Sequence, residues 1–204
     1  MKNIMEQNKN QDGAQKRTVP VESIAQRMVE RMNQTKETAN GKKGALIVID
    51  SQPPVGDNTT IMLYMVELEA VRQQKPVAYF SPELSNVQVV NRLIAIHTGI
   101  DREKIESGML SREEWDTLDR RIPQLMEAPL YVDDTPQPTV ASLQEKVTAL
   151  TKDHGVRLVI VNPVNLVDAD GHSFDSEEDR LGWINRSLIK LSEDLGITIF
   201  AVKK

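Results

Sequence analysis

The feature that most constrains this chain is a short apolar run joined by a tight turn to an apolar helix. Residues 45–49 are rich in β-branched side chains and predict a strand buried on both faces. Residues 60–71 predict a helix inside the protein, because apolar side chains occur around nearly its whole circumference. The turn between them contains Pro53, Pro54 and Gly56. Strand, tight turn and buried helix form the layout of a phosphate-binding loop.

The chemistry of such a loop is missing from these residues. The pattern G-x-x-x-x-G-K-[ST] needs a lysine for the phosphates and a hydroxyl for Mg²⁺. Here Ser51 stands at the first glycine and Gly56 at the second, while Asp57 replaces the lysine and Asn58 the hydroxyl residue. Thr59 or Thr60, just beyond, could offer a hydroxyl to Mg²⁺ in a shifted register, but no lysine lies nearby. Unit charges about 4 Å apart interact by about 4 kcal/mol at an effective dielectric of about 20, so this aspartate turns attraction for phosphate into repulsion.

Composition excludes several classes of protein. A chain of 204 residues is long enough for one domain with a sizeable core. The net charge of −5 argues against a surface built mainly to bind nucleic acid or anionic membrane. The chain has no cysteine, so thiolate metal sites and disulfides are excluded, and we expect no metal site. No apolar run is long enough to span a bilayer, and no signal-peptide core is present, which predicts a cytoplasmic protein.

Beyond the opening strand and helix, strands and helices alternate along the chain. This alternation predicts an α/β protein with a mostly parallel sheet flanked by helices. The expected strands are 45–49, 76–80, 130–134, 156–161 and 197–202. The expected helices are 60–71, 86–97, 102–107, 111–125, 140–152 and 181–195.

The N-terminal region is predicted to be a polar, disordered tail over residues 1–17, followed by an amphipathic helix at about 20–33. One helical face carries an apolar stripe: Val21, Ile24, Ala25, Met28, Val29 and Met32. The helix either packs on its own domain or docks on a neighbouring subunit through Val21, Ile24, Met28 and Met32. Both interpretations stay open. The polar flanks favour docking slightly, and divide the chain into a tail with a docking helix, 1–43, and a core, 44–204.

Four runs of the core carry a resemblance to a known family. Residues 75–85, KPVAYFSPELS, resemble the family's KPVAFFSLEMS, and residues 105–115, IESGMLSREEW, resemble LRTGKLSDEDW. Residues 128–136, APLYVDDTP, are similar to APLYIDDTP, and residues 184–195, INRSLIKLSEDL, to ISRSLKALAKEL. The order and spacing match the C-terminal, RecA-type motor domain of the replicative DNA helicase family, the DnaB family. The resemblance implies a RecA-like P-loop NTPase core with an added N-terminal amphipathic helix.

The departures from the family fall on its catalytic positions. The family's phosphate loop reads ARPSMGKTA, where this chain has SQPPVGDNT. The family's metal-ordering strand reads IVIDYLQL, so Asn162 stands at the aspartate and Asn165 at the glutamine. The last strand reads IALSQL in the family, and Lys203 and Lys204 stand at the serine and glutamine. The sequence ends before the segment expected to supply the family's arginine finger, and it lacks the family's N-terminal partner-binding domain.

One catalytic position keeps the family's residue. Glu83 matches the family's glutamate, which the resemblance implies orients the attacking water. The favoured interpretation is that Glu83 caps the helix that follows. Asp133 and Asp134 precede Thr-Pro and are interpreted as turn formers rather than metal ligands. Trp115 and Trp183 have apolar neighbours on expected helices and are interpreted as packing anchors.

Two functions from different classes remain open. The first is a non-hydrolysing DnaB-like module that needs no cofactor and acts in DNA replication or mobile-element DNA processing, by associating with itself or with a genuine helicase. The second is an ATP-dependent DNA helicase or single-stranded-DNA-dependent ATPase with an atypical site, using ATP and Mg²⁺. Positions 57, 58 and 162 favour the first. The loop at 168–180 is acidic with a single arginine, which predicts weak or absent DNA binding.

Overall fold

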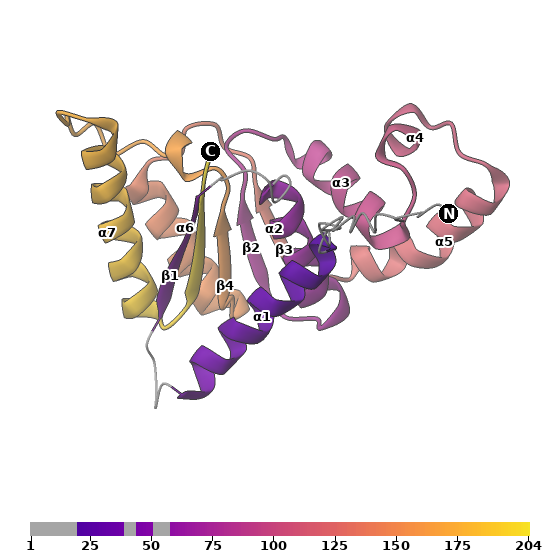
Figure 1. Ribbon diagram of the computed structural model, residues 1–204, viewed down its shortest axis with the longest axis horizontal. Helices are drawn as coiled ribbons and strands as arrows, with labels where there is room; N and C mark the ends of the chain where they lie inside the picture. The colour runs from indigo at the N-terminus through magenta and orange to yellow at the C-terminus, as the bar shows by residue number, and fades with distance from the viewer. Residues whose placement is uncertain (1–19, 39–43, 51–57) are drawn as a thin grey trace, which may run out of the picture.

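The sheet has five parallel strands in the order β1-β5-β4-β2-β3 (Figure 1). The computed structural model describes residues 20–38, 44–50 and 58–204. The strands are β1 Ala45–Asp50, β2 Val77–Phe80, β3 Leu130–Asp133, β4 Leu158–Val161 and β5 Thr198–Lys203. The predicted α/β class and the parallel sheet are confirmed. The expected tail at 1–17, and Gly56 and Asp57 of the turn, lie outside the described residues.

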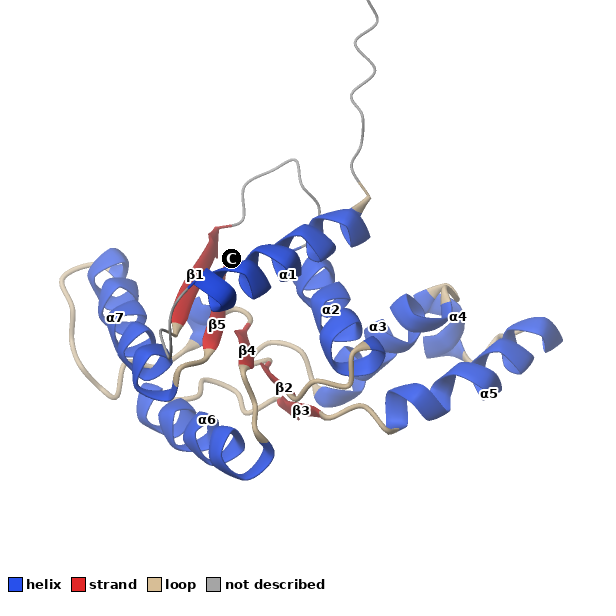
Figure 2. Ribbon diagram, turned by 90° about the horizontal axis from the view of Figure 1, so that it is seen from below, coloured by secondary structure: helices blue, strands red, loops and turns tan. Residues whose placement is uncertain are grey.

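Helices cover both faces of the sheet (Figure 2). On one face lie α6 and α7, and on the other α1, α2 and α3, while α4 and α5 extend past β3 (Figures 1 and 2). The helices are α1 Val21–Thr38, α2 Asn58–Val66, α3 Asn86–Thr98, α4 Arg102–Ser107, α5 Arg112–Met126, α6 Val140–His154 and α7 Glu177–Leu195. A π-helix, η1 Glu67–Arg72, continues α2, and a 3₁₀ turn, η2 Val164–Leu166, follows β4. No described helix is long and apolar enough to cross a membrane.

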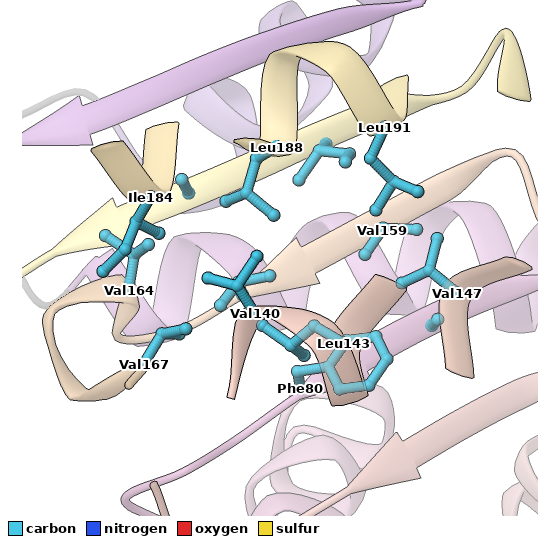
Figure 3. Packing of buried hydrophobic residues seen from close by; sticks show 14 of the residues in the cluster. Phe80, Val140, Leu143, Val147, Val159, Val164, Val167, Ile184, Leu188 and Leu191 are labelled. Carbon is cyan, nitrogen blue, oxygen red and sulfur yellow. The ribbon is translucent and has the colours of Figure 1, made fainter. Parts of the chain in front are cut away.

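The core is divided by the sheet into two apolar layers. Figure 3 shows the layer in which Leu143 and Val147 of α6 and Ile184, Leu188 and Leu191 of α7 pack on the sheet. The other layer is built on α2, whose apolar side chains point in nearly every direction because α1, α3 and the sheet surround it. The fully apolar helix predicted from the sequence is therefore the central helix of that layer.

Helix α1 packs on the chain's own core. Val29 and Met32 are only 3% and 2% exposed and belong to the same apolar layer as α2. Val21, Ile24 and Met28 are partly buried at the margin of that contact. The predicted contact of Met32 with a partner is wrong, because the chain's own apolar layer around α2 already covers this side chain. The contacts of this face therefore match the own-domain interpretation.

The α4–α5 region departs from one expectation. Trp115 on α5 is 47% exposed, so its interpretation as a packing anchor is wrong. Helix α5 protrudes beyond the sheet, and none of its residues is buried. Trp183 is half-buried on α7 against His172 and Phe174, at ring-centroid distances of 4.9 and 6.1 Å, as expected of a packing residue.

Candidate functional site at the carboxyl edge of the sheet

The positions that the family uses for catalysis gather at one edge of the sheet. All strands are parallel, so their carboxyl ends share an edge, where ligands bind in open α/β sheets. Glu83 follows β2, Asn162 follows β4, and Lys204 follows β5. Asn58 and Thr59 begin α2, the first described element after β1. The structure therefore brings together the described candidate residues, which are up to 121 positions apart in sequence.

Asn162 is buried and bonded within the protein. Its side chain is 4% exposed, and its Nδ2 donates to Thr59 Oγ1 at 3.1 Å and to Tyr79 Oη at 2.9 Å. These two bonds join β4 to the start of α2 and to β2. An amide that donates here cannot provide the negative charge with which a carboxylate orders Mg²⁺.

Tyr79 is a member of the site that the sequence analysis did not single out. It lies in β2 and is buried, and its hydroxyl bonds to Asn162. The signal was available, because the family's run KPVAFFSLEMS has phenylalanine at this place and the chain has tyrosine. The added hydroxyl meets the amide that stands at the family's aspartate, so the two differences from the family lie in direct contact.

Glu83 forms an ion pair with Lys204. Lys204 Nζ lies 2.6 Å from Glu83 Oε1 and 2.5 Å from Oε2. Both side chains are more than a third exposed, so solvent screens the pair and its contribution to stability is about 0–1 kcal/mol. Both carboxylate oxygens of Glu83 nevertheless accept from Lys204, the residue that stands at the family's glutamine position.

The expected capping role of Glu83 is wrong. Helix α3 is capped by Ser85, whose hydroxyl accepts from the Gln88 backbone while the Gln88 side chain accepts from the Ser85 backbone. The Asn86 N–H donates to Asp134 Oδ2 at 2.8 Å. The start of this helix is therefore bonded without Glu83.

Asp133 acts as a turn residue, as predicted, whereas Asp134 accepts from the first residue of α3 instead. Asp133 Oδ1 accepts from the Thr135 backbone at 2.9 Å, and its Oδ2 pairs with Lys146 at 2.5 Å. Burial raises the pKa of Asp133, but the bonds from Lys146 and Thr135 outweigh burial and hold that pKa below its usual range. Among the described residues no group of three or more His, Cys, Asp or Glu could hold a metal ion.

The acidic loop after β4 is bonded to the body of the protein. Asp170 Oδ1 accepts from the Ala141 backbone at 3.0 Å, at the start of α6. Arg180 donates to the backbone carbonyls of Val167 and Asn165 at 2.6 and 2.8 Å and pairs with Glu177. The bond to Glu177 raises the pKa of Arg180 above its ordinary value. The loop's single arginine is thus already engaged in intramolecular contacts.

A second cluster of polar contacts, around the buried side chain of Glu67, lies at the far end of α2. Glu67 Oε1 accepts from Arg72 Nε at 2.9 Å and lies 3.1 Å from His97 Nδ1. His97 Nε2 lies 3.2 Å from the Arg121 carbonyl oxygen. These contacts hold α3 and α5 against η1. They lie at the opposite end of α2 from its N-terminus at the carboxyl edge, and we assign them a structural role.

The α3–α5 side presents an apolar groove of about 380 Å³ beside the edge strand β3. Its lining residues are Val90, Leu93, Ile94, Ile122, Leu125, Met126, Ala128, Leu130 and Val132. Val87 on α3 is 69% exposed, and Met126 on α5 is also largely exposed. An exposed apolar patch of this kind is typical of a surface that binds another protein.

Comparison with known proteins gives a family match over most of the chain. The family model for the DnaB-like helicase C-terminal domain matches residues 18–204. The replicative DNA helicase DnaB of Nostoc sp. is 31% identical over 169 residues, covering 82% of this chain and 19% of the relative. The replicative DNA helicase DnaB of Geobacillus stearothermophilus is 27% identical over 167 residues, covering 82% of this chain and 37% of the relative.

Two solved structures share the fold. One is an ATPase domain that superposes with a TM-score of 0.71 at 18% identity, covering 88% of this chain and 70% of that chain. The other is a DnaB-like replicative helicase studied for its interactions with primase, which also gives 0.71, at 19% identity, covering 87% of this chain and 47% of that chain. Both confirm the predicted RecA-like architecture.

Proposed function

The chain belongs to the family of DnaB-like helicase C-terminal domains, and we propose that it is a member that binds other proteins and does not hydrolyse ATP. It spans 19% and 37% of the two curated relatives above. The partners we propose are a second copy of this chain or a genuine DnaB-type helicase, in DNA replication or mobile-element DNA processing.

The observation that supports loss of hydrolysis most strongly is the bonding of Asn162. Metal-assisted phosphoryl transfer in P-loop enzymes holds Mg²⁺ with a carboxylate at this strand end and with a hydroxyl at the start of the helix that follows the phosphate loop. In this chain Asn162 Nδ2 donates to the Thr59 hydroxyl, the group that a shifted metal site would need. The amide hydrogen occupies one of the two acceptor positions of this hydroxyl and places partial positive charge where the family has a carboxylate. The Asp57 replacement supports the same conclusion independently, through its charge.

The alternative is an ATP-dependent helicase with an atypical site, and one observation favours it. Glu83 is retained at the carboxyl edge, and the Lys204 ammonium lies beside it. A lysine entering from β5 would be a cation close to where a phosphate binds in this family. The same ion pair, however, engages both groups with each other, so we retain the non-hydrolysing assignment.

The assignment predicts that Mg-ATP does not stabilise the protein. A ligand at 100 times its dissociation constant raises the free energy of unfolding by about 2.7 kcal/mol, which thermal melting detects easily. We expect the melting temperature to be unchanged by millimolar ATP with Mg²⁺. The G. stearothermophilus relative provides a comparison protein in the same buffer. A rise of several degrees that requires both ATP and Mg²⁺ would support the atypical helicase instead.

Association is proposed to use the margin of α1 and the groove on the α3–α5 side. Val21, Ile24 and Met28 remain partly exposed at the margin of α1, and Ile24 and Met28 line a shallow surface depression with Arg27 and Arg31. The α3–α5 groove is apolar, and its volume of about 380 Å³ suits the apolar side chains of a helix. An amphipathic helix meeting an apolar groove would give the heterologous contact from which rings are built.

Single-stranded DNA is expected to bind negligibly. The loop at 168–180 is acidic, its Arg180 is bonded to Glu177 and to backbone carbonyls, and the net charge is −5. Phosphate binding requires unpaired positive groups. Fluorescence anisotropy with a labelled oligonucleotide at low salt should give no saturable signal in the micromolar range. Micromolar affinity that falls steeply with added salt would contradict this expectation.

A further inference from the structure

The buried ring of His97 faces a hydrogen-bond acceptor at each of its two nitrogens. His97 lies near the end of α3 and is 5% exposed. Its Nδ1 lies 3.1 Å from Glu67 Oε1 on η1, and its Nε2 lies 3.2 Å from the backbone carbonyl oxygen of Arg121 on α5. A carbonyl oxygen can only accept, so Nε2 must carry a hydrogen. Whether Nδ1 also carries one decides whether the ring is charged.

The partner of Nδ1 is the carboxylate of Glu67. This side chain is buried, and Arg72 Nε donates to the same oxygen, Oε1, at 2.9 Å. The bond to Glu67 raises the pKa of Arg72 above its ordinary value, so a charged guanidinium stays beside the carboxylate. A neighbouring guanidinium favours the ionised form of a carboxyl group. An ionised Oε1 can only accept, so its contact with Nδ1 requires a hydrogen on Nδ1.

The other charged groups around the ring balance one another. Glu69 of η1 is directed to Lys75, at 3.5 Å, and the remaining charged side chain of α3 is Arg92. The other charged side chains of α4 and α5 are exposed or, for Glu114, paired with Lys104, and α2 has none. The charged groups that stand close to His97 or to its bonded partners are Glu67 and Arg72 of η1, Arg121 of α5, which donates to the His97 carbonyl oxygen at 2.5 Å, and Glu22 of α1, 3.4 Å from Arg72. Two carboxylates and two guanidiniums cancel, so the two acceptors decide the state of the ring.

We propose that His97 is a doubly protonated imidazolium in the folded protein and acts as a pH-sensitive latch between η1, α3 and α5. While both nitrogens carry hydrogens, the ring bonds α3 to η1 through Glu67 and to α5 through Arg121. Release of the Nδ1 proton to solvent would leave a nitrogen lone pair facing the lone pairs of Oε1 in a buried contact. The bond between α3 and η1 is therefore lost as the pH rises.

The latch lies where the protruding helices join the body of the protein. Helix α5 has no buried residue, so its attachment is sensitive to the loss of a single buried bond. Release of the latch would loosen α5 and the apolar groove that it lines together with α3. This inference goes beyond the proposed function, because it holds whether or not the groove binds a partner and whether or not the protein hydrolyses ATP.

The state of the ring can be measured by ¹⁵N NMR of the full-length protein. The chain has three histidines, His97, His154 and His172. The variants His154→Gln and His172→Gln identify two of the three ring signals, so His97 is assigned without being changed. At about pH 7.5, where a histidine in water is mostly neutral, both ring nitrogens of His97 should have the chemical shift of a protonated nitrogen. A His97 ring with one protonated and one bare nitrogen would overturn the proposal.

A second measurement tests the linkage between this proton and stability, by urea denaturation between about pH 7 and 8. The unfolded chain has released the proton in this range and the folded chain keeps it, so the unfolding equilibrium constant should rise by up to about tenfold per pH unit. His97→Gln should lack this contribution, and the exposed control His172→Gln should behave like the parent. Equal pH dependence of the parent and His97→Gln would contradict the latch. The NMR measurement keeps His97 unchanged, so it decides the question even if His97→Gln does not fold.

Discussion

A Val29→Asp variant is expected to lose about 4 kcal/mol of its free energy of unfolding. Val29 is 3% exposed between α1 and the core around α2, so the change removes an apolar contact and buries a carboxylate. Urea denaturation followed by circular dichroism would measure the loss. An unchanged midpoint would mean that α1 does not pack on α2 in solution.

The matched control is the double variant Ile24→Asp and Met28→Asp on the same helix. Both side chains are only partly buried at the margin of the α1–α2 contact, so we expect a cost of about 1 kcal/mol each. Because an apolar side chain buried at an interface contributes roughly 1.5–3 kcal/mol, the double variant should abolish α1-mediated association if the margin docks on a partner. Sedimentation reports association. If the double variant is as destabilised as Val29→Asp and associates normally, the docking role is wrong and all of α1 belongs to its own core.

These two variants separate interpretations that the sequence could not separate. The stripe on residues 20–33 predicted an amphipathic helix correctly, but a stripe does not say which surface covers it. Ala25, Val29 and Met32 face the chain's own α2, whereas Ile24 and Met28 lie at the margin. The division depends on how α1 crosses α2, which is a tertiary property.

The strands and helices were predictable because their patterns are local. Continuous β-branched runs such as 158–161 indicate strands buried on both faces, and capping residues such as Ser111 with Glu114 mark helix starts within four positions. The π-helical turn at Glu67–Arg72 was not predicted. It places Glu67 beside Arg72 five residues later and beside His97 of α3, a contact that periodicity does not encode.

The sequence predicted which residues lie at the candidate site, but it did not predict the hydrogen-bond and ion-pair partners of those residues. The sequence placed Asn162 and Glu83 at family positions, but their partners lie far along the chain. Thr59 and Tyr79 are 103 and 83 positions from Asn162, and Lys204 is 121 positions from Glu83. Only the order of strands brings these ends together. Trp115 was misassigned for a similar reason, since α5 protrudes and no other described element covers that side chain.

Restoring two residues of the family pattern, with Asp57→Lys and Asn162→Asp in one chain, is expected to make the melting temperature respond to Mg-ATP. The first change reverses a charge at the phosphate position, and the second supplies a carboxylate for Mg²⁺. At 100 times the dissociation constant the stabilisation would be about 2.7 kcal/mol, or roughly 5–10 °C for a chain of this size. The fold should tolerate the carboxylate, because the hydroxyls of Thr59 and Tyr79 can both turn to donate to it.

The single variants serve as controls, because each restores only one of the two charges. Asp57→Lys alone should bind the phosphates weakly and without dependence on Mg²⁺, and Asn162→Asp alone should not respond to nucleotide. A further change, Lys204→Gln, frees Glu83 from its ion pair and is the step at which hydrolysis, as distinct from binding, would return. If the melting temperature of the folded double variant does not respond to Mg-ATP, the loss of nucleotide binding involves more than these two charges. A parent chain that already responds would mean that the amide of Asn162 and the aspartate at 57 do not prevent nucleotide binding.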